Sequence, residues 1–407
     1  MSSVPIGQLF EYVIGGGWGN ESASENTVPV AVIRGADFPE VMKRSVDGLP
    51  RRFEDRGAVA KRMLQPGDIV LEISGGTRER PTGRSVFVTE SMLRDAGEAV
   101  IPASFCRLVR PNSAEVDPAW LFYFLQDWWN EGESWSYQNQ STGIANFRFK
   151  VFANQVLVNR PHRSVQEGVG EILGALDDKI AVNHSTLLLV LQLLEVRYRA
   201  IGKVRHSLLF EDVARIGGGA TPSTKDPGLW GQGIPWLTPT DVTRVDGVWI
   251  DHTERTISQA GLSSISSPLY PSGSIAMTSR ATIGACALLG EDMAVNQGFI
   301  VLQSKDPSMQ LWLYCQLLDR VEELKAWANG ATFLELPKKI FRRLPVEMGD
   351  KVSMGEFAVF ATPLMERVHA LQRENSRLAA TRDELLPLLM SGKITVKDAE
   401  KTVEEVV

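Results

Sequence analysis

The chain has few cysteines, and the three that it has, Cys106, Cys286 and Cys315, lie far apart in its 407 residues. An odd number of widely spaced cysteines does not fit a disulfide framework. It fits a protein that works in the reducing cytoplasm. The five histidines are also scattered, and none stands at ligand spacing with a cysteine or a carboxylate. We therefore expect no structural metal site.

The sequence also lacks a continuous run of about 18 apolar residues, so we expect no membrane span. Its first residues, MSSVPIGQLFEYV, do not lead from a basic segment into an apolar one, which argues against a secretory signal. The composition, 43% hydrophobic and 23% charged, is typical of globular proteins. At this length the chain can form two or more domains, each with a core of its own.

Motifs that carry catalysis are missing as well. The glycine-rich stretch 217–225 lacks the Gly-Lys-Ser/Thr ending of a P-loop, and the stretch 15–19 does not continue into a helix as a dinucleotide fingerprint should. We interpret both as turns at which the backbone closely approaches another surface. Glu335 and Lys338 have the spacing of some nuclease sites, but Pro337 would interrupt the strand. The pair Asp177 and Asp178 lies within a long helical pattern, where a solvated face is the better interpretation.

The net charge of −6 weakens the case for binding nucleic acid without excluding it, because phosphate contacts need only a local basic face. Such a face is available, since residues 43–62 carry seven basic side chains against three acidic ones. Lys338, Lys339, Arg342 and Arg343 form a second cluster. For either cluster alone, ordinary solvated surface charge remains the alternative.

The chain repeats itself with a period near 190 to 205 residues, which indicates a duplicated domain. The matching segments keep the same order in both halves. They are 10–13 with 210–213, 15–17 with 217–219, 29–33 with 234–237, 64–70 with 269–275, 105–109 with 298–302, and 120–125 with 311–318. Each half consists of short strands punctuated by glycine and proline turns, followed by one short amphipathic helix.

Each half ends in a long helix, predicted over residues 165–201 and about 353–390. At about 1.5 Å per residue such a helix is roughly 55 Å long. Pro363 suits a helix start, so we expect the preceding turn to be separate or kinked, and Pro387 implies another kink or break. Apolar residues recur at spacings of three and four, which is a heptad seam.

We expect the two apolar stripes to bury each other as an antiparallel coiled coil, in which seam asparagines cost some stability and specify register. The alternative is that each helix packs on its own globular module. The predicted seam and partner-docking residues are Leu176, Ile180, Asn183, Leu187, Leu191, Leu364, Val368, Leu371, Asn375 and Leu378.

Several segments, taken together and in order, resemble those of one family. Residues 218–223 resemble its Gly-Gly-Thr-Pro-Ser segment with Ala220 inserted, 236–241 its strand-to-loop signature, and 293–299 its Asn-Gln-Gly segment. Residues 173–183 resemble its first helical spacer, and 385–394 its end motif. The family is that of the specificity subunits of type I restriction–modification systems, and the resemblance spans essentially the whole chain.

The resemblance implies an α+β fold with two similar globular target-recognition domains in a pseudo-twofold arrangement. These would be residues 1–164 and 205–350, followed by spacer helices at 165–204 and 351–392 and a C-terminal tail at 393–407. The family implies a non-catalytic subunit, in which each domain reads one half of a split, asymmetric site in double-stranded DNA. The helices would set the gap and dock two methyltransferase subunits, and restriction subunits could join them. No cofactor is implied for this chain, because S-adenosylmethionine, ATP and magnesium would be bound by those partners.

Side chains that contact phosphates and base edges are most often basic or polar ones, here expected on loops. In the first module we expect contacts from Arg51, Arg52, Arg56, Arg78, Arg80, Thr82 and Arg84. In the second we expect them from Thr221, Ser223, Lys225, Ser279 and Arg280. Gln138, Asn139, Gln140 and Asn146 are polar enough to read bases, although a simple surface loop fits equally well.

Two other functions stay open. The chain could be a coiled-coil adaptor whose globular ends bind protein, which the net charge slightly favours over DNA. It could also be the specificity subunit of a related restriction system, with the same role but different nuclease partners.

Overall fold

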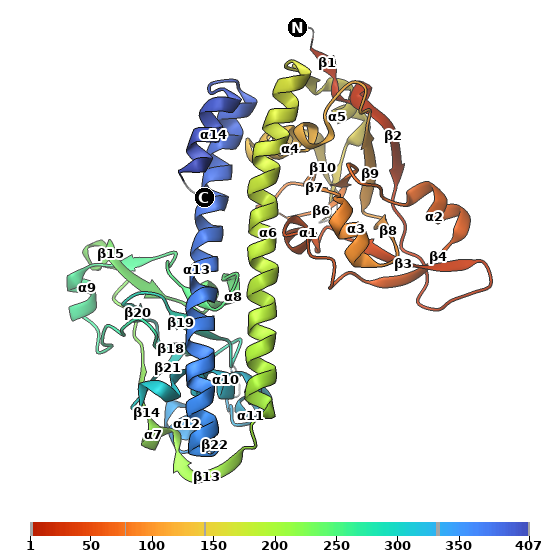
Figure 1. Cartoon of the computed structure of the whole chain (residues 1–407). Coiled ribbons are helices and arrows are strands. Elements are labelled where there is room, and N and C mark those ends of the chain that lie inside the picture. Colours follow the sequence, from red (N-terminus) through yellow and green to blue (C-terminus); the bar gives the residue numbers. More distant parts are fainter. Residues whose placement is uncertain (1–2, 78, 142–143, 331–333, 406–407) are drawn as a thin grey trace. The chain divides into compact units, whose positions relative to one another are not determined.

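The computed structural model describes residues 3–77, 79–141, 144–330 and 334–405 and divides the chain into two compact units. Unit 1 comprises residues 1–185 and 374–407, and unit 2 comprises residues 186–373. Each unit combines sheets and short helices with part of two long helices, α6 (Arg163–Ala200) and α13 (Lys351–Met390) (Figure 1). The predicted mixed fold with two long helices is confirmed.

Unit 1 contains a four-stranded antiparallel sheet in the order β2-β9-β5-β7 and two three-stranded sheets, β4-β3-β8 and β10-β11-β6. The strands are β1 (Val4–Pro5), β2 (Phe10–Gly15), β3 (Thr27–Ile33), β4 (Arg51–Asp55), β5 (Ile69–Glu72), β6 (Ser74–Gly76), β7 (Ser85–Phe87), β8 (Ala99–Pro102), β9 (Cys106–Pro111), β10 (Gln138–Ser141), β11 (Ile144–Phe147) and β12 (Leu157–Val158). The short helices are α1 (Phe38–Met42), α2 (Arg56–Arg62), α3 (Glu90–Ala96), α4 (Pro118–Asn130), α5 (Phe149–Gln155) and α14 (Val396–Glu404).

Unit 2 contains a five-stranded sheet in the order β14-β21-β18-β19-β16 and a three-stranded sheet, β17-β15-β20. The strands are β13 (Val204–Leu209), β14 (Ala214–Gly218), β15 (Trp230–Leu237), β16 (Trp249–Ile250), β17 (Thr256–Ile257), β18 (Ile275–Thr278), β19 (Cys286–Leu289), β20 (Ala294–Val295), β21 (Phe299–Ser304) and β22 (Pro345–Met348). The short helices are α7 (Phe210–Val213), α8 (Pro239–Arg244), α9 (Gln259–Ser263), α10 (Gln310–Asp319), α11 (Val321–Ala326) and α12 (Lys338–Arg342).

The predicted duplication is confirmed by the strand pairings. The order β2-β9-β5-β7 in unit 1 is repeated by β14-β21-β18-β19 in unit 2. Each unit also has a three-stranded sheet whose central strand has one antiparallel and one parallel partner. In unit 1 the central strand β3 pairs antiparallel with β4 and parallel with β8. In unit 2 the central strand β15 pairs antiparallel with β17 and parallel with β20. A short antiparallel pair, β1 with β12 or β13 with β22, completes each unit. The two halves therefore share one topology as well as similar sequence segments.

The expected close backbone approaches occur at the glycine-rich stretches. A Cβ on Gly16 would lie under 3.0 Å from the carbonyl oxygens of Pro102 and Ala103, and a Cβ on Gly219 would lie equally close to those of Val295 and Asn296. Glycine is required at both places because any side chain would collide with the backbone of the parallel-paired strand. The expected close approach is confirmed, but the interpretation as turns is wrong for Gly15, Gly217 and Gly218, which lie in the strands β2 and β14.

The long helices differ from the prediction at the prolines. Helix α13 continues without a break through Pro363 and Pro387, where the sequence predicted a start, a kink or a break. A proline removes one backbone donor and crowds the carbonyl of the fourth residue before it. For Pro363 that residue is Val359, which is highly exposed. Water can therefore satisfy its carbonyl, and the remaining helical bonds and the packing on either side maintain the helix.

The long helices pack on each other and also on the globular parts. In unit 1, Asn375 Nδ2 donates to the carbonyl of Ile180 over 3.2 Å. In unit 2, the ring of Tyr198 on α6 lies 4.8 Å from that of Trp312 and 6.1 Å from that of Phe357 on α13. Both packing modes weighed for the helices therefore occur together, and each helix is part of the core of each unit.

The buried asparagines behave as expected for polar residues in a helical seam. Among the described residues, Asn183 Nδ2 and Asn375 Oδ1 have no hydrogen-bond partner although they are buried. A buried polar atom without a partner costs free energy. Their presence therefore fits a role in fixing the alignment of the two helices and not in maximal stability.

Two further expectations are corrected. Asp177 does not lie on a solvated face: it is buried and accepts hydrogen bonds from Tyr123 and Arg382, which are distant in sequence. The C-terminal segment 393–407, expected as a tail, contains α14, whose Ala399 lies in the core of unit 1.

By length and composition alone, α6 is apolar enough to cross a membrane, although the sequence has no continuous run of about 18 apolar residues. A helix that packs in the core of a protein passes the same test. Val169, Leu173 and Leu176 are buried in the core of unit 1, and Leu194 and Tyr198 in that of unit 2. Packing of these side chains accounts for part of the apolar character of α6, while Leu189 and Val196 are exposed.

Candidate nucleic-acid interface

In unit 1, the loop that joins β6 to β7 carries the arginines predicted to contact DNA. Its base is the carboxylate of Glu72, which is only 2% exposed. Arg84 donates to both Glu72 oxygens over 2.8 and 3.0 Å and to the carbonyl of Gly35 over 2.6 Å. Arg80 lies 3.7 Å from the same carboxylate and donates to the carbonyl of Gly75. One buried negative charge therefore holds two arginines, and the group keeps a net positive charge.

The hairpin β10–β11 lies against this loop. Thr82 is fully buried, and both its amide and its hydroxyl donate to Gln138 Oε1 over 3.1 and 3.2 Å. Ser74 Oγ donates to Asn146 Oδ1 over 3.0 Å. Thr82 and Arg84 thus support the loop from beneath, while Arg80 is more exposed. Arg78 lies outside the described residues.

The other predicted contacts of unit 1 lie on β4 and α2. Arg51 is paired with Glu98. Arg52 lies over the ring of Trp18, 4.7 Å from its centroid, and 3.6 Å from Glu21. Arg56 is exposed on the first turn of α2. Of these three arginines, Arg56 is the one that forms no ion pair with a carboxylate within the described part of the chain.

In unit 2, three of the family-like segments meet at one place, which we call the motif junction (residues 218–223, 236–241 and 293–299). Trp236 Nε1 donates to the carbonyl of Ala220 over 3.1 Å, and the amide of Ala220 donates to Val295 over 3.1 Å. The amide of Asn296 donates to Leu237 over 2.9 Å. The hydroxyl of Thr221 donates to the side chain of Gln297. Segments that are up to 81 residues apart in sequence are therefore fixed together through backbone and side-chain bonds.

The predicted contact residues of unit 2 surround the motif junction. Thr221, Ser223 and Lys225 are exposed on the loop after β14. Ser279 is buried. Its backbone amide donates to the carbonyl of Gly298, and its carbonyl accepts from the amide of Leu336. The next residue, Arg280, is exposed but lies 3.0 Å from Glu335. Sequence reasoning identified these loops but missed the carboxylates that pair with their arginines, because pattern alone gives no contact between distant segments.

Most of the predicted docking residues on the long helices face inward. Leu176, Leu187, Val368, Leu371 and Leu378 are buried, so a partner protein has no access to them. The remaining apolar ones, Ile180, Leu191 and Leu364, are partly buried against the cores. These residues hold the helices in place. Any surface that docks a partner would therefore need other side chains.

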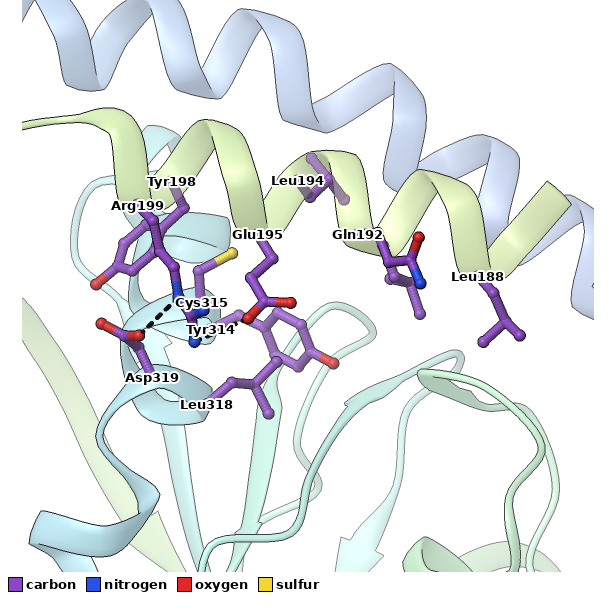
Figure 2. A pocket seen from close by; sticks show the side chains of 11 residues that line it. Leu188, Gln192, Leu194, Glu195, Tyr198, Arg199, Tyr314, Cys315, Leu318 and Asp319 are labelled. Carbon is purple, nitrogen blue, oxygen red and sulfur yellow. Dashed lines mark hydrogen bonds and ion pairs between the residues drawn. The ribbon is translucent and has the colours of Figure 1, made fainter. Parts of the chain in front are cut away.

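Helix α6 does expose an apolar face in unit 2. Leu189 is 65% exposed, Leu193 49% and Val196 66%, and their spacing of four and three places them on one side of the helix. On another side, a mainly apolar pocket of about 280 Å³ lies between α6 and α10. Figure 2 shows its lining, in which Leu188 and Tyr198 come from α6 and Tyr314 and Leu318 from α10.

The three cysteines are poor candidates for chemistry. Burial is the largest cause that raises the pKa of each thiol, to about 12 for Cys106, Cys286 and Cys315. The nucleophile and metal ligand is the thiolate, which is scarce at neutral pH when the pKa is this high. No group of three His, Cys, Asp or Glu side chains that could hold a metal ion occurs within the described part of the chain.

Comparison with known proteins gives a match to one family. Residues 210–348 match the family described as "Type I restriction modification DNA specificity domain". The specificity subunit of the type I restriction enzyme MjaIX from Methanocaldococcus jannaschii is 29% identical over 177 residues, 43% of this chain and 41% of that protein. The HindI specificity subunit from Haemophilus influenzae is 27% identical over 186 residues, 45% of this chain and 40% of that protein. The chain thus matches less than half the length of these two relatives.

A solved structure shares the fold along the chain. The crystal structure of the S subunit of a type I restriction–modification system from M. genitalium has a TM-score of 0.58 and covers 95% of both chains. Its sequence identity is 14%, so the likeness concerns the fold.

Proposed function

Since the chain is related to the specificity subunits of type I restriction–modification systems, we propose that it selects the DNA sequence on which such a complex acts. The observation that carries the proposal is the motif junction of unit 2, where family-like segments meet beside exposed loops with Thr221, Ser223 and Lys225. Unit 1 repeats the strand order of unit 2. Each unit is therefore assigned one half of the recognition site.

Each unit is proposed to use different side chains for this reading. Unit 1 would present Arg80 and Arg56, and the hairpin β10–β11, whereas unit 2 would present the loops of the motif junction. Because base edges are read by individual side chains, unlike loops select unlike half-sites. The target is then asymmetric and split, and the long helices set the gap.

Host methylation gives the first test. Methylome sequencing with and without this gene should show one motif that disappears when the gene is deleted, made of two different half-sites with a fixed gap. Restoring the gene should restore the same motif, whereas a copy with a stop codon near its start should not. A continuous or palindromic motif would contradict the two-reader assignment.

Catalysis is assigned to partner proteins. Methyltransferase subunits would bind S-adenosylmethionine and transfer the methyl group, and restriction subunits would use ATP and magnesium. The complex would act in the cytoplasm, and the raised pKa values of the thiols fit a chain that takes no part in cysteine chemistry.

The exposed face of α6 is the proposed docking site for a methyltransferase subunit. Leu189→Asp with Val196→Asp should lower partner affinity by about tenfold or more, because a carboxylate buried in an apolar interface loses its hydration, and about 1.4 kcal/mol corresponds to a tenfold change. Both side chains are exposed, so the melting temperature should change little. Affinity is measured by titrating labelled methyltransferase onto the full chain.

The matched control is Leu157→Asp, an exposed leucine on β12 outside the long helices, which should leave partner affinity unchanged. Equal affinity of the α6 variant and the unaltered chain would exclude this face. A chain that binds protein partners but whose deletion changes no methylation would instead favour the adaptor function.

A further inference from the structure

Next to the motif junction, unit 2 has a polar pocket of about 360 Å³ that the proposed function leaves unexplained. The glycine-rich end of β14, residues 217–219, forms one wall. Arg215, Lys338 and Arg342 are the charged residues among its lining residues. No carboxylate belongs to this described lining, so the pocket is positively charged.

Two of the cationic side chains in this pocket are accessible to a ligand. Arg215 and Lys338 are exposed, and neither forms an ion pair with another described residue. A Cβ on Gly218 would lie 3.1 Å from Lys338 Nζ, so the missing side chain lets the ammonium group approach the strand. Arg342 is more enclosed and donates to the carbonyl of Ile216 over 2.8 Å.

Two backbone carbonyls of the pocket lining, those of Gly218 and Ile216, accept hydrogen bonds from internal donors. Tyr270 donates its hydroxyl proton to the carbonyl of Gly218 over 2.7 Å, and Ser267 donates to the same oxygen over 3.2 Å. Arg342 likewise donates to the carbonyl of Ile216, so these two carbonyls are already paired with internal donors. The site therefore combines cations with a wall of glycine backbone, an arrangement that suits a phosphate group.

The chain on both sides of the pocket leads into the proposed reading loops. Gly219 is followed directly by the loop with Thr221 and Ser223. Lys338 follows the segment in which the amide of Leu336 bonds to Ser279. A strand of DNA that contacts these loops would thus pass the pocket.

Unit 1 is built differently at the corresponding strand. The equivalent strands β2 and β14 end at Gly15 and Gly218. Counting back three residues from each end makes Tyr12 on β2 the counterpart of Arg215 on β14. The arginine that reaches Gly15 there, Arg62, lies 3.7 Å from Glu54 and is partly neutralised. The open basic pocket is therefore a feature of unit 2.

We propose that this pocket binds one backbone phosphate of the DNA and anchors unit 2 without regard to base sequence. The inference rests on the proposed function, which assigns DNA to this unit. Arg215 and Lys338 supply the charge for the phosphodiester, and the glycines allow the close approach.

The test is the salt dependence of binding by the full chain to two 30-base-pair duplexes, one with the methylome motif and one of scrambled sequence. Removing one phosphate contact makes the slope of log affinity against log salt concentration shallower by about 0.9. Arg215→Gln with Lys338→Gln should show that change on both duplexes. The charge-conserving pair Arg215→Lys with Lys338→Arg should keep the original slope, and the methylated motif should be the same in all variants.

The matched control is Lys339→Gln with Arg343→Gln, which removes the same charge from exposed neighbours that do not line the pocket. An equal change of slope in this control, or none in the pocket variant, would overturn the phosphate site while leaving the proposed function standing. If the pocket variant loses binding to the motif duplex but not to the scrambled duplex, the phosphate site is also overturned, because such a loss would mean that the pocket reads bases. If the unaltered chain shows no salt-dependent binding to either duplex even with its methyltransferase partner present, the proposed function fails as well.

Free inorganic phosphate is the other source of the same chemistry. Stabilisation of the chain by millimolar phosphate that depends on Lys338, together with an unchanged DNA slope in the pocket variant, would assign the pocket to the free ion and overturn the DNA contact.

Discussion

Replacing Gly219 with alanine is expected to lower the free energy of unfolding by about 3 kcal/mol. The new Cβ would lie under 3.0 Å from the carbonyl oxygens of Val295 and Asn296, which are backbone atoms and cannot rotate away. The two segments must separate, and the bond from Ala220 to Val295 that joins them is lost. Denaturant unfolding of the full chain measures the change, and DNA binding by unit 2 should fall with it.

The same substitution at Gly355 should have the opposite sign. Gly355 lies inside α13, and a Cβ there would meet no atom within 4 Å. Alanine is favoured over glycine in a helix by about 1 kcal/mol, so Gly355→Ala should stabilise the protein. A Gly219→Ala variant as stable as the unaltered chain would show that the two segments of the motif junction are not in contact.

Replacing Asp177 with alanine should cost about 3 kcal/mol of stability, because it breaks a buried ion pair and leaves the partner charge behind. Asp177 is 3% exposed, and its two oxygens accept from Arg382 Nη1 over 2.6 Å and from the Tyr123 hydroxyl over 2.7 Å. Burial and the nearby Asp177 raise the pKa of Tyr123 well above its ordinary value, so this hydroxyl remains a donor.

The neighbouring residue supplies the control for this change. Asp178 is largely exposed and lies 3.2 Å from Arg44, so Asp178→Ala should cost about 1 kcal/mol or less. Thermal unfolding of both variants gives the comparison. Similar losses at 177 and 178 would mean that the buried contact with Arg382 and Tyr123 contributes nothing special.

Much of the fold is present in the sequence because duplication repeats the same local signals in the same order. The glycines at 15–19 and 217–219 and the long heptad patterns need no knowledge of distant contacts. Asp177 shows where such reasoning stops. Periodicity placed it on a solvated face, and its actual environment depends on Arg382, which is 205 residues further along the chain.

The candidate site was predictable by region more than by residue. The loops around 74–84, 219–225 and 279–280 were identified from composition, and the structure places them beside the hairpin β10–β11 and the motif junction. The exposed or buried state of each side chain was not predictable, since Glu72 and Glu335 are paired with their arginines by tertiary structure. Which of these residues touch DNA stays a prediction.

The division of the chain into units also determines the order in which they can be completed during synthesis. Unit 2 is one continuous segment, 186–373, and lies between the two parts of unit 1. The core of unit 1 includes Leu385, Leu389 and Ala399. On the ribosome, the second unit has all of its residues before the first unit does. The first part of unit 1 therefore cannot complete its core, and part of its apolar surface stays uncovered, until residues beyond 374 have emerged from the ribosome.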